Sequence, residues 1–192
     1  MVAVNSTMMA LGTAAPAFSL PTPDGEMVSN TDFAGKPLLV MFICNHCPFV
    51  QHIAAELADL GRTYGDRGVG VVAIQTNDVA NYPDDGPEKM KAESADRGYV
   101  FPYVYDETQD VSKAYGAACT PDFFLFDADR KLVYRGQFDA SRPRNDIAVS
   151  GEDLNAAVAA LVEDIPISVE QIPSLGCNVK WKAGNEPEYF NS

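Results

Sequence analysis

The sequence of 192 residues has few basic side chains, few cysteines and no long apolar segment. Lys and Arg number 14 against 27 Asp and Glu, and the formal net charge is −13. Such a chain is repelled by nucleic-acid phosphates and anionic membrane surfaces. No run of 18 apolar residues occurs, and the N-terminal stretch lacks the basic and apolar regions of a signal peptide. We therefore expect a cytoplasmic protein with no nucleic-acid partner and no membrane partner.

Four cysteines are too few for the disulfide scaffold of a small secreted domain, and they are more typical of a catalytic or metal-binding role. Hydrophobic residues make up 46% of the chain and charged residues 21%, which are globular proportions. A chain of this length has room for one sizeable core. We therefore expect residues 1–192 to form a single domain, with its core at about 16–164 and a C-terminal tail at about 165–192.

Hydrophobic patterning predicts an α/β fold. Residues 37–43 form a continuous apolar run, which is typical of a strand buried on both faces. A helical pattern follows Pro48, and residues 69–74 form a second apolar strand, so the two strands are expected to be parallel. The other predicted elements are a hairpin within 16–36, a polar helix at 87–97, a strand at 101–105, a helix with capping-box spacing from 106 to 116, a hairpin of 123–127 with 131–136, and a helix capped within 150–153. The tail shows no periodicity, which predicts ordered chain without regular structure.

The sequence Cys44-Asn45-His46-Cys47 lies where the first predicted strand meets the first predicted helix. Unpaired N–H groups and the helix dipole favour a thiolate there, so we expect Cys44 to be a nucleophile. Cys47 is placed to attack the mixed disulfide that Cys44 forms. A protonated His46, with Asn45 beside it, is expected to tune the pKa of Cys44. This chemistry needs no cofactor beyond a Cys44–Cys47 disulfide.

Two other interpretations of this motif stay open. Cys44 and Cys47 are half of a zinc site if Cys119, Cys177 or His46 completes four ligands, although the sequence has no second CxxC or HxxxH motif. Both cysteines are alternatively structural and buried on a core helix. Redox chemistry explains the position between strand and helix better than either, so we expect no bound metal.

A second group of candidate residues is Cys119-Thr120-Pro121-Asp122, just before a predicted strand. A cis Thr120–Pro121 bond would expose the Thr120 backbone to an incoming substrate chain, whereas a plain turn is the alternative. Cys119 precedes this proline, and Cys177 belongs to a tail that could fold over the site. Both are candidate auxiliary thiols, with packed, unreactive thiols as the alternative.

Residues 37–48, with Cys44 and Cys47, and residues 120–127, with Thr120-Pro121, resemble the thioredoxin superfamily. More narrowly, the whole chain resembles peroxiredoxin-like proteins of the alkyl hydroperoxide reductase/thiol-specific antioxidant (AhpC/TSA) group that carry a CxxC motif. The resemblance implies a thioredoxin-like fold, in which helices flank a central mixed β-sheet and residues 77–107 are an inserted helix-strand unit. It also implies that Cys44 is the exposed nucleophile, that Cys47 is the resolving thiol and that a cis-proline loop faces both.

Four positions depart from these families. Asn45-His46 replaces the Gly-Pro of a typical thioredoxin, and Leu38 stands where thioredoxins carry a buried acid. Met41 stands where true peroxiredoxins carry a Thr whose hydroxyl holds the peroxide. We therefore expect a thiol–disulfide oxidoreductase that acts on protein or small-molecule disulfides and depends on a thiol reductant system. A thiol peroxidase with Cys44 as the peroxidatic cysteine is the alternative, and a zinc-holding or non-catalytic binding module is a more distant one.

Overall fold

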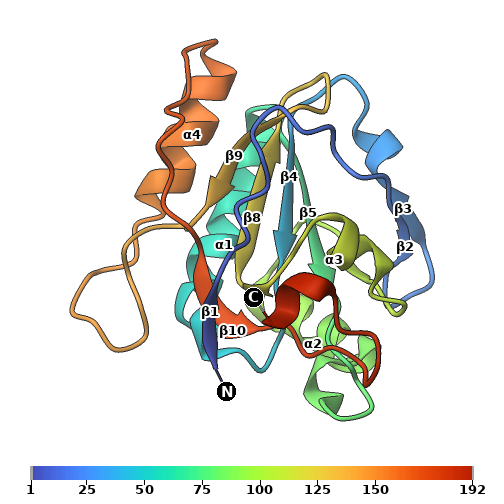
Figure 1. Ribbon diagram of the computed structural model, residues 1–192. Coiled ribbons are helices and arrows are strands. Elements are labelled where there is room, and N and C mark those ends of the chain that lie inside the picture. Colours follow the sequence, from blue (N-terminus) through green and yellow to red (C-terminus); the bar gives the residue numbers. More distant parts are fainter. Residues whose placement is uncertain (1, 192) are drawn as a thin grey trace.

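A central five-stranded sheet organises the computed structural model, which describes residues 2–191 (Figure 1). The strand order is β6-β5-β4-β8-β9; β4 is parallel to β5 and antiparallel to β8, so the sheet is mixed as expected. The five strands are β4 (Leu38–Phe42), β5 (Gly70–Gln75), β6 (Tyr103–Tyr105), β8 (Asp122–Phe126) and β9 (Leu132–Gly136). The helices are α1 (Pro48–Asp66), α2 (Pro87–Arg97), α3 (Asp110–Ala114) and α4 (Glu152–Val162), with short 3₁₀ turns η1 (Asn30–Phe33), η2 (Pro83–Asp85) and η3 (Glu188–Asn191).

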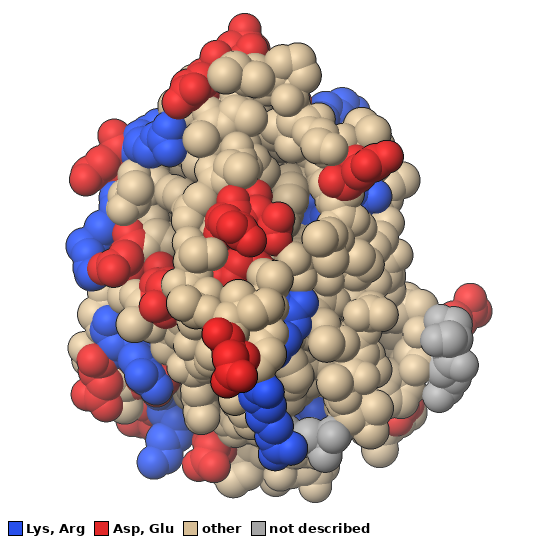
Figure 2. All heavy atoms as spheres, turned by 90° about the vertical axis from the view of Figure 1, so that its left-hand side faces the viewer, with Lys and Arg blue, Asp and Glu red and all other residues tan. Residues whose placement is uncertain are grey.

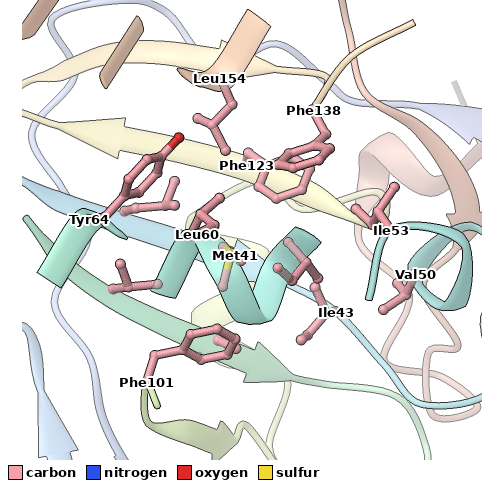
Figure 3. Packing of buried hydrophobic residues seen from close by; sticks show 14 of the residues in the cluster. Met41, Ile43, Val50, Ile53, Leu60, Tyr64, Phe101, Phe123, Phe138 and Leu154 are labelled. Atoms are coloured by element: carbon pink, nitrogen blue, oxygen red, sulfur yellow. The ribbon is translucent and has the colours of Figure 1, made fainter. Parts of the chain in front are cut away.

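The central strand β4 separates two hydrophobic cores, because alternate side chains of a strand point to opposite faces. Leu39 and Met41 face the core that α1 and α4 cover, whereas Val40 and Phe42 face the core beneath α3 and the N-terminal hairpin. Figure 3 shows the first core, where side chains of α1 meet those of β4 and β8. All five side chains of β4 are buried, and full burial of one large apolar side chain stabilises the fold by about 1.5–3 kcal/mol. The continuous apolar run of the sequence therefore forms the middle of the sheet.

Most predicted elements are confirmed with shifts of one or two residues, and the N-terminal hairpin consists of β2 (Ser19–Pro21) and β3 (Met27–Ser29). The predicted helix caps are wrong. Helix α3 begins after Gln109 and α4 after Gly151, both in the left-handed conformation and without a side-chain cap. Asp106 is not the N-cap residue, but its carboxylate lies at the start of α3, where it accepts hydrogen bonds from the backbone N–H and the hydroxyl of Ser112 in the first turn of the helix.

The C-terminal tail departs from its prediction, because it contains a strand. β10 (Leu175–Asn178) lies between β1 (Ala3–Asn5) and β7 (Cys119–Thr120) in a small antiparallel sheet. Figure 1 shows this segment, in orange and red, beside the N-terminal strand in blue and across the start of α1. Four residues are too few to show strand periodicity, and the pairing depends on segments far apart in the sequence. The two ends of the chain are thus brought to the end of the central sheet at which α1 begins.

Two observations concern the helices and the charged side chains of one surface. Within residues 2–191, no helix is both long enough and apolar enough to cross a membrane. Figure 2 shows one face of the molecule, on which Lys and Arg side chains lie among Asp and Glu side chains without merging into a continuous basic surface. That face offers no extended positive surface for a phosphate backbone.

Candidate active site

The CxxC segment connects the middle strand of the sheet to the longest helix. Strand β4 ends at Phe42 and α1 begins at Pro48, so Cys44 and Cys47 lie in the connection between them. Cys47 is the N-cap residue of α1, and Pro48 occupies the first helical position, where the missing N–H costs nothing. Cys44 is only 1% exposed and Cys47 is 0% exposed, so the expectation of an exposed Cys44 is wrong for this arrangement. A substrate therefore reaches the sulfur atoms only after the surrounding chain moves.

The Thr120–Pro121 bond is cis, as expected from the resemblance, and it lies directly against both sulfur atoms. Phe42 pairs with Asp122 across the antiparallel β4–β8 ladder, so the residues before Asp122 are brought beside those after Phe42. The Thr120 hydroxyl lies 3.3 Å from Cys44 Sγ, and the Thr120 carbonyl oxygen lies 3.1 Å from Cys47 Sγ. The sheet register thus joins two motifs that are more than 70 residues apart.

Asp85, in η2 of the insertion, holds the CxxC segment from the other side. Its side chain is fully buried and accepts hydrogen bonds from the backbone N–H groups of Asn45 (2.9 Å) and His46 (3.1 Å). His46 Nδ1 lies 2.5 Å from Asp85 Oδ2, and the amide of Asn77 donates to the same carboxylate at 2.9 Å. Four donors on one carboxylate fix the backbone between the two cysteines and offset the cost of burying the charge.

The residues between the cysteines are held by their side chains as well. The His46 ring stacks on Tyr82, with the ring centroids 5.2 Å apart. Asn45 donates to the carbonyl of Asp84 (2.9 Å) and accepts from the Tyr103 hydroxyl (3.2 Å). The His46 ring is thus directed toward Asp85, and its Nδ1 lies 3.9 Å from Cys44 Sγ, at the limit of a hydrogen bond to sulfur. That His46 and Asn45 tune the Cys44 pKa stays a prediction, and the shortest side-chain hydrogen bonds of both residues are with the insertion.

The two thiols differ in acidity. Burial raises the pKa of Cys44 well above its ordinary value, and the hydrogen bond with Cys47 and the negative charge of Asp85 raise it further. The pKa of Cys47 is lowered, chiefly by hydrogen bonds from the thiols of Cys177 and Cys44, while the Val50 N–H in the first turn of α1 contributes in the same direction. The sequence led us to expect the thiolate at Cys44. In this closed arrangement the N-cap cysteine loses its proton more readily.

The two candidate auxiliary thiols occupy different positions. Cys177 in β10 lies opposite Thr120 and in hydrogen-bonding contact with Cys47. Cys119 points to the other face of β7, with its sulfur 3.6 Å from the Pro121 carbonyl and 3.9 Å from the Ser174 carbonyl. The structure therefore brings three of the four cysteines together and leaves Cys119 behind the cis-proline segment. All four are reduced.

A metal ion fits this arrangement poorly. Donor atoms of Cys44, His46 and Asp85 lie within 4.8 Å of one another. However, His46 Nδ1 and Asp85 Oδ2 are only 2.5 Å apart, whereas two ligands on one zinc ion, each about 2.0–2.1 Å from it, lie about 3.3 Å apart. The distance is that of a charge-assisted hydrogen bond. The absence of a bound metal stays a prediction, which elemental analysis of the purified protein would check.

Asp85 and Gly176 were not predicted as site residues from the sequence. An acidic residue in a stretch rich in Pro, Gly and Asp is typical of a solvated loop, and nothing in its spacing indicates contact with the CxxC segment. Gly176 packs so closely on Thr120 that a Cβ there would collide with the Thr120 carbonyl. Its position next to Cys177 was a usable signal, because a glycine often marks the close approach of two backbone segments.

Comparisons with known proteins show which proteins this chain is similar to. A model of the AhpC/TSA family matches residues 11–135. The thiol-disulfide oxidoreductase ResA of Geobacillus thermodenitrificans is 30% identical over 128 residues, which is 66% of this chain and 68% of ResA. Peroxiredoxin Bcp of Escherichia coli K12 is 32% identical over 136 residues, which is 64% of this chain and 82% of Bcp.

Two solved structures extend the comparison to the fold. An uncharacterized conserved protein from Geobacillus kaustophilus is 53% identical, with a TM-score of 0.92 over 95% of this chain and 97% of that protein. The thioredoxin domain of a thiol-disulfide oxidoreductase from Bacteroides vulgatus is 25% identical, with a TM-score of 0.57 over 66% of this chain and 88% of that domain. The predicted thioredoxin-like fold is confirmed.

Proposed function

Since the chain belongs to the AhpC/TSA family, we propose that it is a thiol–disulfide oxidoreductase whose Cys44/Cys47 couple acts on protein or small-molecule disulfides. The observation that carries the proposal is the placement of both sulfur atoms against Thr120, next to a cis proline and at the start of α1. Relatives named as a thiol-disulfide oxidoreductase and as a peroxiredoxin support the same class of chemistry.

In the proposed reaction the Cys44 thiolate attacks one sulfur of the substrate disulfide. A Cys44–substrate mixed disulfide forms, and the other substrate sulfur leaves as a thiolate. Cys47 then attacks Cys44 Sγ, which closes the Cys44–Cys47 disulfide and releases the second substrate thiolate. The lowered pKa of Cys47 suits this resolving step, because the thiolate is the attacking form. The raised pKa of Cys44 means that the first step requires the site to open to water.

We further propose a cytoplasmic location, where a thiol reductant of the cell would return the disulfide to the dithiol. Equilibration in poised glutathione buffers, followed by alkylation and mass mapping, tests the couple directly. A potential near about −270 mV would identify a reductant, and one near about −120 mV an oxidant or isomerase. If the Cys44–Cys47 disulfide never forms, the proposed function is wrong.

Turnover is tested with insulin as the substrate and dithiothreitol as the electron donor. We expect Cys44→Ser and Cys47→Ser each to lose roughly 100-fold or more of the catalysed rate, because each removes a sulfur that must form a bond. Cys119→Ser is the matched control and keeps the rate. Full activity of Cys44→Ser would contradict the proposal.

Peroxide reduction is a second candidate, favoured by one contact. Met41 is buried in the core and offers no hydroxyl, but the Thr120 hydroxyl lies 3.3 Å from Cys44 Sγ and supplies one from another strand. Attack of Cys44 on a peroxide would give a sulfenic acid and an alcohol or water, and Cys47 would condense with the sulfenic acid, releasing water. Thr120→Val would then slow peroxide consumption more than insulin reduction, whereas equal slowing of both would argue against this candidate.

A further inference from the structure

β10 lies along the backbone edge beside the two active sulfur atoms. Cys177 is opposite Thr120, and Asn178 is opposite Cys119, in an antiparallel ladder on β7. Backbone groups of β7 on this edge are already paired with β10, so an extended substrate that approached the same edge of the backbone before Pro121 would have to displace β10. The chain's own C-terminal segment thus occupies the place of a substrate strand.

The side chain that β10 presents to the site is a thiol. Cys177 is 3% exposed and belongs to the same buried cluster as Cys44 and Cys47. It is in hydrogen-bonding contact with Cys47, and this contact raises the pKa of Cys177 while it lowers that of Cys47. A thiol in contact with one sulfur of a dithiol has the position from which exchange with the corresponding disulfide takes place.

The close approach of β10 depends on a glycine. Any Cβ at Gly176 would collide with the carbonyl of Thr120, so only glycine lets the strand lie this near to the cis-proline segment. On the outer side, a groove lined by Pro48, Phe49, Arg144 and Leu175 leads to Cys177. The tail is therefore packed at the site through its backbone, with Cys177 between the groove and Cys47.

From these contacts we propose that Cys177 is a third redox thiol, which exchanges with the Cys44–Cys47 disulfide by attacking Cys47. The proposal rests on the proposed function, which supplies that disulfide. Cys177 gives up its proton, and its sulfur forms a bond to Cys47 Sγ. The Cys44–Cys47 bond breaks, its electron pair stays on Cys44 Sγ, and a proton returns to that sulfur. No further oxidant is consumed, and β10 becomes covalently joined to α1.

Mapping of tryptic peptides distinguishes the Cys44–Cys47 disulfide from the Cys47–Cys177 disulfide. Cys44 and Cys47 both lie in residues 1–62, since Lys36 precedes Pro37 and is not cleaved, while Cys177 lies in residues 145–180 and Cys119 in residues 114–130. A Cys44–Cys47 bond therefore stays within one peptide, and a Cys47–Cys177 bond joins two. The experiment oxidises the protein with oxidised glutathione, blocks thiols with N-ethylmaleimide in denaturant, and digests it without reductant.

We expect wild type to give both disulfides and Cys44→Ser to give the 1–62 to 145–180 cross-link as its main product. Cys47→Ser should reduce that cross-link by about tenfold or more, because it removes the partner sulfur. Cys119→Ser should match wild type. The proposal is overturned if wild type forms Cys44–Cys47 while neither it nor Cys44→Ser forms the cross-link, or if the cross-link persists in Cys47→Ser. Failure of wild type to form Cys44–Cys47 would instead contradict the proposed function.

Gly176→Ala tests whether strand placement causes the exchange. The added methyl must push β10 away from Thr120, so the cross-link should form about tenfold or more slowly, while Cys44–Cys47 still forms and reports an intact site. Gly65→Ala is the matched control, because a Cβ there meets nothing within 4 Å. Unchanged cross-linking in Gly176→Ala would show that the register of β10 does not position Cys177.

Discussion

Asp85 and Asp122 are both fully buried and both lie next to the segments that hold Cys44 and Cys47, but their partners differ. Asp85 receives four hydrogen bonds, three of them from Asn45 and His46 between the cysteines. Asp122, beyond the cis proline, receives one from the Phe123 N–H at 3.2 Å, and its Oδ2 has no partner within residues 2–191. Burial raises the pKa of Asp122 to about 7, and the nearby hydroxyls of Ser6 and Ser174 lower it only in part.

The two sides of the site are therefore held in place by different interactions. On the insertion side, charge and several N–H donors fix one backbone conformation of the CxxC segment. On the side of the tail, Asp122, which has few hydrogen-bond donors, and strand β10 adjoin the cis-proline segment. The stability of this side therefore depends on pH, through Asp122, and on the pairing of β10 with β7. We expect the insertion side to stay in place while the side of the tail opens.

The largest effect on stability is expected from Asp85→Ala. The substitution leaves donors of the half-buried Asn45 and His46 and of the buried Asn77 without an acceptor, and it should lower the free energy of unfolding by roughly 3–5 kcal/mol. Urea unfolding at pH 7 measures this. Asp84→Ala is the matched control, because the Asp84 side chain is exposed and the residue contributes its backbone carbonyl, so we expect a change within about 0.5 kcal/mol. Equal losses of unfolding free energy in Asp85→Ala and Asp84→Ala would show that the buried Asp85 carboxylate does not hold the insertion side in place.

Asp122→Asn should change the pH dependence of stability. Because the folded pKa of about 7 lies above the ordinary value of 3.8, the wild-type fold holds a proton that the unfolded chain has lost, and its stability falls as pH rises from about 4 to 7. Asparagine does not titrate, so Asp122→Asn does not lose stability in this way as pH rises. Its advantage over wild type should therefore grow with pH and level off above pH 7, at no more than roughly 4 kcal/mol.

Urea unfolding of wild type and Asp122→Asn at pH 4.5, 6 and 8 measures that advantage. Asp129→Asn, at an exposed position in the turn between β8 and β9, is the control and should run parallel to wild type. If the Asp122→Asn and wild-type curves also run parallel, Asp122 does not change its protonation over this range.

A more local effect is expected at the thiol. The negative charge of Asp85 raises the pKa of Cys44, so Asp85→Asn should lower it while keeping an oxygen to accept from the backbone N–H groups. Alkylation rate against pH, in a Cys47→Ser background that leaves Cys44 as the thiol of the CxxC segment, measures the shift. An unchanged or higher Cys44 pKa in Asp85→Asn would show that the charge of Asp85 does not raise the pKa of this thiol.

The parts of the site that belong to the central sheet could be predicted from the sequence. The run of residues 37–43, the helix after Pro48 and the order of the strands follow from local hydrophobic patterns, which do not depend on distant contacts. Thr120-Pro121 was placed through resemblance to a known family, and the β4–β8 register then brings it to the sulfur atoms. These parts of the site belong to the central sheet, where pattern and topology agree.

Asp85 and β10 could not be predicted, because each acts through contacts that cross the sequence. Asp85 accepts from residues about 40 positions earlier, and its neighbours Asp84 and Gly86 give the stretch the composition of an exposed turn. β10 has four residues, and its pairing with β7 spans more than 50 positions. Short paired segments of this kind are decided by tertiary packing rather than by local propensity.

The smallest predicted effect concerns the hydroxyl groups of two tyrosines on the insertion side, Tyr103 and Tyr99. The Tyr103 hydroxyl donates to Asn45 Oδ1 at 3.2 Å, so Tyr103→Phe should lower the free energy of unfolding by about 1 kcal/mol, the net value of one hydrogen bond. The Tyr99 hydroxyl is buried without a hydrogen-bond partner within residues 2–191, so Tyr99→Phe should cost nothing or stabilise slightly. Both substitutions remove one oxygen from a ring in the same region, and urea unfolding compares them directly. If the two losses are equal, the hydroxyl of Tyr103 does not hold Asn45, and the backbone N–H bonds to Asp85 fix the CxxC segment without it.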